Sequence, residues 1–526
     1  MKTALSLLLP LFLTISALAQ DQADTTINAL IRKHGLQQSK VMETASWLTD
    51  VYGPRLTGSP MLDKATAWTL EQLKAWGLSE VHTEAWGPFG RGWELKRFQM
   101  HATAPNYFPV SAWPKAWSPS VDGTVQADVV YLNASSEADL EKYKGKLAGK
   151  FVLTQEPRPT EPWFEGTAER RDAANLLDLA NAPEPGDNSG RRRGGGRGGR
   201  NMGFFQAMND FIYAEKPLAL LDRAAKGDQG TIFVQGARAK SGSAYAADAD
   251  VLPQVTLAVE QYNRICRMLE KNVPVQLSME LQTEYTNPDG MEHNIIAEIP
   301  GTDLKDEVVM FGAHFDSWHA GTGATDNASG SAVMMEAARI LMETIKESGV
   351  QPRRTLRLAL WTGEEQGLLG SSAYVGEHFA EMDGRTVRAI KPGQAKVSAY
   401  YNFDNGTGKI RGIYMQGNEK VASVFRPWLD AFKDLDANTL TLSNTGSTDH
   451  IPFDRAGIPG FQFIQDPIDY STRTHHSNMD VYDELVADDL KQAATIVASL
   501  VWHTAQRDEL IPRKRVRVVE ESSGEK

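Results

Sequence analysis

The sequence contains very little cysteine: Cys266 is the only one among 526 residues. No intrachain disulfide can form, and a metal site built from thiolates is excluded. Any metal held by this chain must therefore be bound by histidine, aspartate and glutamate.

Long apolar runs are also absent, except at the N-terminus. The segment "MKTALSLLLPLFLTISALAQ" has an early lysine, a short apolar stretch and Ala17-Leu18-Ala19. This pattern is typical of a signal peptide over residues 1–19, whereas the run is too short for a spanning helix. We therefore expect a secreted or periplasmic protein with no membrane span in the mature chain.

The chain has no excess of positive charge. Its formal net charge is −12, which would on average repel nucleic acid and anionic membranes. The arginine and glycine run at 190–200 lacks interleaved aromatic residues that could stack on bases. We interpret residues 184–201 as a flexible, solvated loop and expect no nucleic-acid partner.

The pattern of apolar residues changes along the chain. Short strands and turns are indicated between about Gln126 and Leu281, and afterwards apolar runs of strand length alternate with helical patterns such as "GSAVMMEAARILMETI". Such alternation predicts an α/β fold, with a mostly parallel mixed sheet covered by helices on both faces. The expected parts are 20–125 (first part of the α/β domain), 126–281 (a β-rich insert), 282–510 (the catalytic core) and 511–526 (a charged tail).

Ionisable residues stand where the apolar runs end. Ligands of open parallel sheets bind outside the carboxyl ends of the strands, so these side chains are expected to converge. Histidine and carboxylate ligands without sulfur suit one zinc ion or a zinc pair. The candidates are His314, Asp316, Glu364, Glu365, Asp404, His475 and His476 at strand ends, and Asp326 in a glycine-rich turn before a helix.

Each candidate also has a simpler explanation. Asp326 could cap the following helix, and Glu364 and Glu365 could be acids in a first helical turn that favour the helix dipole. The conjunction of several strand ends and one helix start at the same sheet edge favours a metal site.

Two long segments, "GAHFDSWHAGTGATDNASG" and "RTLRLALWTGEEQGLLGS", carry a resemblance to a known family. From about Arg55 to Leu500 the chain resembles the co-catalytic di-zinc aminopeptidases, most closely the plasma glutamate carboxypeptidase branch. The resemblance implies the zinc exopeptidase fold. It also implies that the β-rich region is a protease-associated insert, with "KYKGKLAGKFVL" as its most recognisable stretch.

The same resemblance implies a metal-ligand set for two zinc ions per chain. His314 and Asp404 would hold one ion, and Glu365 and His476 the other, with Asp326 between them. His476 is preferred because "HSNMD" matches the family pattern, and its neighbour His475 is the alternative.

Roles for further residues follow from the resemblance. Glu364 would be the general acid and base, and Asp316 would orient the ring of His314. Pocket residues are expected at Asp449, His450 and Tyr470, with Tyr470 placed to polarise the substrate carbonyl.

The predicted function is a di-zinc metallo-exopeptidase acting on the ends of short peptides, with removal of an N-terminal residue preferred. A dipeptidase or carboxypeptidase is the main alternative. A catalytically inactive binding ectodomain and a one-zinc glutaminyl-cyclase-like transferase are further alternatives. Peptides are the expected partners, and the sequence leaves the oligomeric state open, a homodimer included.

Overall fold

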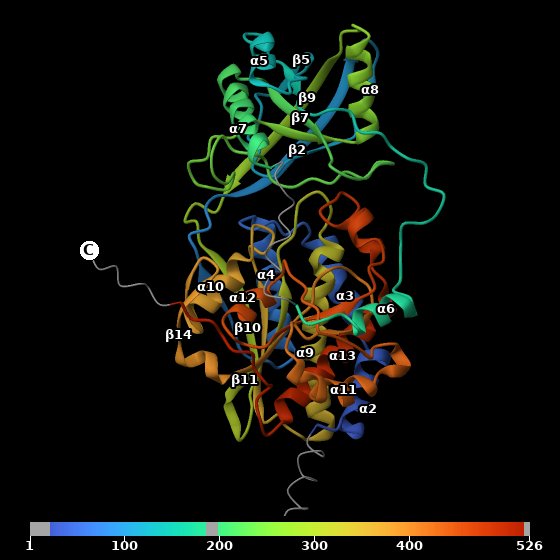
Figure 1. The fold of residues 1–526 in the computed structure, drawn as a ribbon, viewed down its shortest axis with the longest axis vertical. Coiled ribbons are helices and arrows are strands. Elements are labelled where there is room, and N and C mark those ends of the chain that lie inside the picture. Colours follow the sequence, from blue (N-terminus) through green and yellow to red (C-terminus); the bar gives the residue numbers. More distant parts are fainter. Residues whose placement is uncertain (1–20, 186–197, 520–526) are drawn as a thin grey trace, which may run out of the picture.

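The computed structural model of the chain describes residues 21–185 and 198–519. The predicted signal peptide, most of the arginine-glycine loop and the end of the charged tail lie outside the described residues. The described residues form a larger α/β domain and a smaller β-rich domain, which are stacked along the long axis of the molecule (Figure 1).

The larger domain is built on a mixed sheet. Its central strands β12, β11, β15 and β18 are parallel neighbours, while β10 is antiparallel to β12, β1 to β10, and β16 to β18. This arrangement confirms the predicted mostly parallel mixed sheet. In spatial order the strands are β1 (Ser79–Trp86), β10 (Glu292–Ile299), β12 (Arg354–Trp361), β11 (Leu304–His314), β15 (Val397–Asn402), β18 (Gly460–Gln465), β16 (Ile410–Tyr414) and β17 (Thr439–Thr441).

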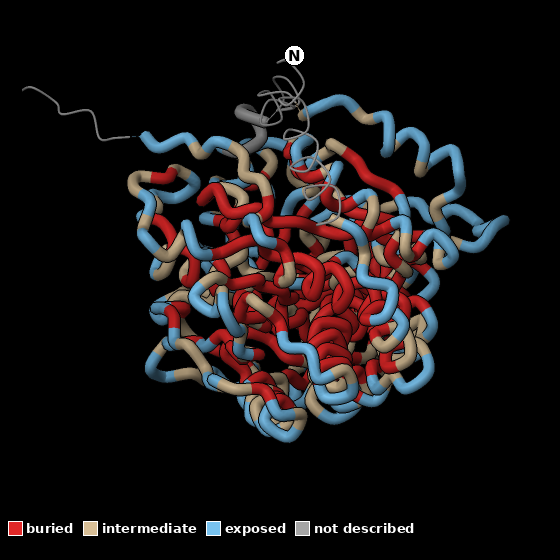
Figure 2. Tube along the Cα trace, turned by 90° about the horizontal axis from the view of Figure 1, so that it is seen from below, coloured by how far each residue is buried: buried red, intermediate tan, exposed pale blue. Residues whose placement is uncertain are grey.

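Helices cover both faces of this sheet because side chains alternate along each strand. Val309 and Phe311 of β11 join the core under one set of helices, whereas Val308 and Met310 join the core on the opposite face. Figure 2 shows the buried residues concentrated inside and the exposed loops around them. The first face carries α2 (Thr25–Arg32), α3 (Val41–Ser46), α4 (Pro60–Ala75), α9 (Ser329–Ser348), α11 (Ala422–Asp430) and α13 (Ala487–Gln506); the second carries α10 (Leu369–His378) and α12 (His450–Arg455).

The smaller domain has its own sheet and its own apolar core, in which Cys266 is buried. Helices α5 (Glu137–Leu140), α7 (Gly198–Glu215) and α8 (Val259–Glu270) flank it (Figure 1). In spatial order its strands are β3 (Phe108–Pro109), β2 (Gly92–Ala104), β9 (Gln276–Thr286), β5 (Thr124–Tyr131), β6 (Phe151–Leu153), β7 (Ala219–Arg223), β8 (Gln254–Leu257) and β4 (Ala112–Pro114).

The limits of this domain differ from the expected insert 126–281. Strand β2 pairs along its length with β9, so residues from Gly92 onward already belong to the second sheet. The pairing partners are far apart in sequence, and therefore a change of local pattern near Gln126 could not reveal this.

Two smaller features lie near the edges of the larger domain. A hairpin of β13 (Ala380–Asp383) and β14 (Thr386–Ile390) follows α10. A strap, defined as residues 169–180 and containing α6 (Ala173–Ala180), crosses from the smaller domain onto the larger one (Figure 1). Across the described part of the chain, no helix has the length and apolar character needed to cross a bilayer.

Candidate metal centre

The predicted ligands stand at the carboxyl ends of parallel strands. His314 is the last residue of β11, Glu364 and Glu365 follow β12, and Asp404 follows β15. Because β11 lies between β12 and β15, the three strand ends bring these side chains together.

Asp326 lies in a turn at Ala324–Ala328 between β11 and α9. The turn opens on Gly323, whose φ of +65° is a left-handed conformation that favours glycine. The buried carboxylate of Asp480 accepts the Thr325 N–H at 2.6 Å and the Asp326 N–H at 3.2 Å. These bonds fix the main chain from which the Asp326 carboxylate projects.

His476 follows a turn at Tyr470–Thr474 after β18, and the smaller domain holds it from outside. The N–H of Val234 donates to the His476 carbonyl at 2.9 Å, and the Gln235 amide lies 2.9 Å from His476 Nδ1. The smaller domain therefore orients a candidate metal ligand of the larger domain.

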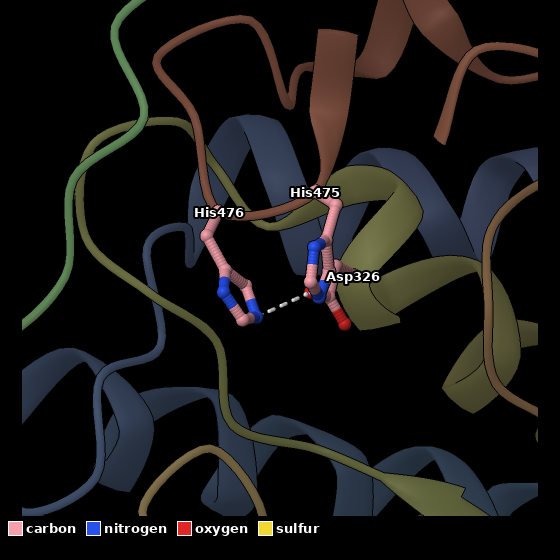
Figure 3. Close-up of side chains that lie close together, drawn as sticks. All are labelled: Asp326, His475 and His476. Carbon is pink, nitrogen blue, oxygen red and sulfur yellow. Dashed lines mark ion pairs between the residues drawn. The ribbon is translucent and has the colours of Figure 1, made fainter. Parts of the chain in front are cut away.

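Asp326 lies between the two histidines. Its Oδ1 is 3.2 Å from His314 Nε2. Its Oδ2 is 3.1 Å from His476 Nε2, the pair joined by the dashed line in Figure 3. On the outer sides, Asp404 Oδ1 lies 3.6 Å from His314 Nε2, and Glu365 Oε2 lies 2.9 Å from His476 Nε2. The ligand atoms thus form two groups that share Asp326.

The donor set fits divalent zinc. Asp326 Oδ2 and Glu365 Oε1 are buried and lack a hydrogen-bond partner among the described residues, which is costly unless a cation satisfies them. Two ligands on one tetrahedral zinc, each about 2.1 Å from it, would lie about 3.4 Å apart. The observed separations of 2.9–3.6 Å match this spacing.

His475 also approaches the centre. Its Nε2 lies 3.8 Å from Asp326 Oδ2, and its ring lies against that of His476 in Figure 3. Its side chain is 36% exposed, compared with 18% for His476, and the ion pair with Glu365 is made by His476. The geometry favours His476 but brings both histidines to the same carboxylate.

The charge of the cluster is predominantly negative. Burial, followed by the neighbouring Asp326 carboxylate, raises the pKa of Glu365 to about 7. Burial opposes the charged form of His476, but Glu365 and Asp326 outweigh it and raise its pKa to about 10. Carboxylates crowded in a buried site are the environment that a divalent cation would stabilise.

Asp316 contacts the ring of His314 and also the segment that carries the two glutamates. The ring of His314 contacts the main-chain carbonyl of Asp316 at 3.1 Å, whereas the carboxylate is 3.7 Å from the ring. The carboxylate instead accepts the N–H groups of Glu364 at 3.2 Å and Glu365 at 3.4 Å, and the Thr57 hydroxyl at 2.8 Å. Asp316 therefore positions the adjacent glutamates.

The three expected pocket residues are separated by the structure. Asp449 accepts the Ser371 hydroxyl at 2.5 Å, and His450 lies 3.2 Å from the Thr445 carbonyl; both are fully buried behind the cavity wall. Only Tyr470 lines the cavity. Asp449 and His450 do not line the cavity themselves, so the part in shaping the pocket expected of them would be exerted from behind its wall.

A cavity of about 1120 Å³ opens above the cluster. Four residues of the cluster line it: Asp326, Glu364, Glu365 and His476. The lining also contains Leu368, which directly precedes α10, and residues of α10, of the β13–β14 hairpin and of α12; they are Ser372, Gly384, Arg385, Ile451 and Arg455.

Sequence reasoning missed three supporting residues. Asp480 is the aspartate of "HSNMD", and this pattern could have identified it. The buried guanidinium of Arg55 donates to main-chain carbonyls of Thr322 and Gly323 at 3.0 Å, beside the Asp326 turn. Gln235 lies in a loop of the other domain, where no local signal marks it.

The chain was compared with known proteins. Over 94% of its length it is 26% identical to carboxypeptidase Q of Mus musculus, covering 91% of that protein. Among solved structures it resembles a peptidase M28 precursor from Shewanella amazonensis, with a TM-score of 0.64, 23% identity and coverage of 93% of this chain and 98% of that one. A zinc aminopeptidase from Bacillus subtilis has a TM-score of 0.55 at 19% identity, covering 88% and 93% of the two chains. These structural likenesses show the fold.

The fold, the buried cluster and the sequence relatives together define a metallopeptidase. Residues 294–501 match the model described as Peptidase family M28. The matched segment contains every candidate metal ligand and both adjacent glutamates.

Proposed function

We propose that the protein is a zinc-dependent exopeptidase that hydrolyses peptide bonds at the ends of short peptides. The observation that carries this proposal is the position of Asp326, whose two oxygens lie 3.2 and 3.1 Å from His314 and His476. A carboxylate between two such groups is suited to two metal ions rather than one.

The residues that would hold the ions follow from the grouping. His314 and Asp404 would bind one zinc, Glu365 and His476 the other, and Asp326 would be shared. Zinc supplies polarisation of the scissile carbonyl and activation of water at neutral pH.

Glu364 is left for proton transfer. It lines the cavity beside the ligands, and its N–H is held by Asp316 at 3.2 Å. Its carboxylate would take a proton from the attacking water and deliver it to the leaving amine. Tyr470 lines the same cavity and is placed to donate a hydrogen bond to the substrate carbonyl.

Exopeptidase action is supported by the surroundings of the centre. The smaller domain contacts the His476 segment directly, through Val234 and Gln235. A site flanked in this way admits a chain end more easily than the middle of a folded protein. Removal of an N-terminal residue is the preferred activity.

Cleavage of free dipeptides, or a carboxypeptidase activity, is the second candidate. It is favoured by the 26% identity that extends over 94% of the chain to a protein named carboxypeptidase Q. Export to the periplasm or outside the cell is proposed from residues 1–19, which lie outside the described residues.

Metal removal tests the proposal. Chelation should abolish hydrolysis of short peptides, zinc should restore it, and elemental analysis should find about two zinc equivalents per chain. One equivalent would favour a glutaminyl-cyclase-like transferase, and none would favour a binding protein. Efficient cleavage of a peptide blocked at both ends would contradict exopeptidase action.

A further inference from the structure

Two arginines line the same cavity as the metal-ligand cluster. They are Arg385 of the β13–β14 hairpin and Arg455 of α12, whereas carboxylates such as Asp326 and Glu364 come from the turns that follow β11 and β12. The cavity lining therefore contains basic groups that neither metal binding nor proton transfer requires.

Arg385 is placed by the β13–β14 hairpin. Asp383 pairs with Thr386, so Gly384 and Arg385 form a two-residue turn. Gly384 has φ of +56°, the left-handed conformation that a first turn position of this kind requires. The hairpin tip thus brings an arginine to the cavity from outside the main sheet.

Arg455 is the last residue of α12. Ile451 and Arg455 both line the cavity. They are four residues apart within the helix, so they lie on the same helix face, about 6 Å apart along its axis. This face of α12 therefore borders the cavity.

Neither arginine has an ion-pair partner among the described residues, although most arginines near them do. Arg388, on the same hairpin, pairs with Asp383, and the carboxylate of Asp454, next to Arg455, is taken by Lys514 at 2.7 Å. Burial and then the nearby Arg385 guanidinium lower the pKa of Arg455, so the two positive groups lie close to each other. Two guanidinium groups that lie close together in a cavity wall, without ion-pair partners, would favour the binding of a negatively charged group of a ligand.

We propose that Arg385 and Arg455 bind a carboxylate of the substrate, on the side of the leaving amine. Arginine is the residue best suited to carboxylates, which it can hold with two parallel hydrogen bonds. Glu364, which would serve the leaving amine, lies shortly before α10 in the chain, and α10 contributes Ser372 to the cavity lining. Helix α10 also contacts β13 and α12, the elements next to Arg385 and Arg455. The departing part of the peptide would therefore extend along α10 toward the two arginines.

The inference rests on the proposed exopeptidase function and narrows its substrate. The preferred substrates are dipeptides and very short peptides with a free C-terminal carboxylate. An acidic side chain on the leaving residue would offer the same chemistry, so the experiment must separate these two sources.

The test compares Ala-Ala, Ala-Ala-amide and Ala-Glu-amide as substrates of the zinc-loaded protein. The wild type should cleave Ala-Ala with a kcat/KM at least tenfold higher than Ala-Ala-amide. Each of Arg385→Gln and Arg455→Gln should lower kcat/KM for Ala-Ala by about 10- to 100-fold, as loss of a charged hydrogen bond predicts. The amide, which lacks the carboxylate, should be affected less than threefold.

Arg388→Gln is the matched control, because Arg388 is on the same hairpin but does not line the cavity. Arg388→Gln should leave the kcat/KM for each of the three substrates within twofold of the wild-type value. If the wild type cleaves Ala-Glu-amide with a higher kcat/KM than Ala-Ala-amide, the subsite also accepts the acidic side chain of the leaving residue.

Binding separates this inference from the proposed function. Calorimetry of Ala-Ala and Ala-Ala-amide on zinc-loaded Glu364→Gln needs no turnover. Tighter binding of the free acid, lost in an added Arg455→Gln, supports the carboxylate subsite even if the wild type cleaves nothing. Equal binding and equal cleavage of acid and amide by the wild type would overturn it.

Discussion

At the residue scale, the adjacent glutamates Glu364 and Glu365 show how neighbours take different roles. Glu365 Oε2 lies 2.9 Å from His476, within the ligand cluster, whereas Glu364 lines the cavity and makes no ion pair within the described residues. Asp316 binds both main-chain N–H groups, so the two side chains leave a fixed backbone in different directions.

Glu364→Gln should retain the metals and the fold but reduce turnover by about 10²- to 10⁴-fold, the usual contribution of a general base. Glu365→Gln should lower metal content as well as rate, since an amide is a weaker ligand. Metal analysis and kcat measured on both variants separate the two roles.

The exposed Glu377→Gln serves as a control and should change neither quantity. If both glutamates were only acids in a first helical turn, each change would cost about 0.3–1 kcal/mol of stability with unchanged turnover. Equal metal loss in the two variants would mean that the assigned roles are wrong.

Much of the centre could be predicted because its residues directly follow apolar runs. His314, Glu365 and Asp404 were found in this way, and the structure brings them together. The hydrogen bonds from the N–H groups of Glu364 and Glu365 to Asp316 could not be predicted, since they depend on which atom of a side chain or main chain faces a neighbour. Sequence patterns indicate position along an element, but not hydrogen-bond geometry.

At the scale of helices and strands, the sequence predicts the elements that depend on residues close together in the chain better than the pairings between distant residues. The run "GSAVMMEAARILMETI" corresponds to α9, because it depends on local periodicity. Strand β2 was missed as part of the smaller domain, since its pairing with β9 joins residues far apart in the chain.

The loop that carries Gln235 supports His476 from the smaller domain. The amide nitrogen of Gln235 lies 2.9 Å from His476 Nδ1, and this contact fixes the orientation of the ring, whose Nε2 faces Asp326 and Glu365. Gln235→Ala should therefore weaken zinc affinity by about 10- to 100-fold, the usual effect of losing such a partner. Competition with a zinc chelator measures the zinc affinity of each variant and needs no activity assay.

Gln235→Glu places a carboxylate of nearly the same size beside Nδ1, where it can accept the Nδ1–H, and should retain most of the affinity. Gln229→Ala, which changes an exposed glutamine of the same segment, should have no effect. Unchanged zinc affinity in Gln235→Ala would show that the Val234 main-chain bond alone positions His476.

At the scale of the whole molecule, the strap connects the two domains by polar contacts. Its helix α6 contains no buried residue, so apolar burial contributes little to its docking. Arg170 donates to the buried Asp466 at 2.9 Å and to Asp489 at 2.7 Å, and the Arg171 N–H donates to Asp466 at 3.0 Å. The strap should therefore detach without unfolding either core.

Arg170→Gln should reduce the free energy that holds the strap in place by about 1.5–3 kcal/mol, as expected for hydrogen bonds to charged groups. Asp466 keeps its partner Arg411, at 2.8 Å, so the buried carboxylate is not left unpaired and the cores should remain intact. Hydrogen exchange should become about 10- to 100-fold faster within residues 169–180 and stay unchanged in β11 and β15.

Lys142→Gln removes an exposed ion pair with Asp139 and should change neither region, because such pairs contribute about 0–1 kcal/mol. Faster exchange throughout the larger domain in Arg170→Gln would instead mean that the strap and the catalytic core unfold as one unit.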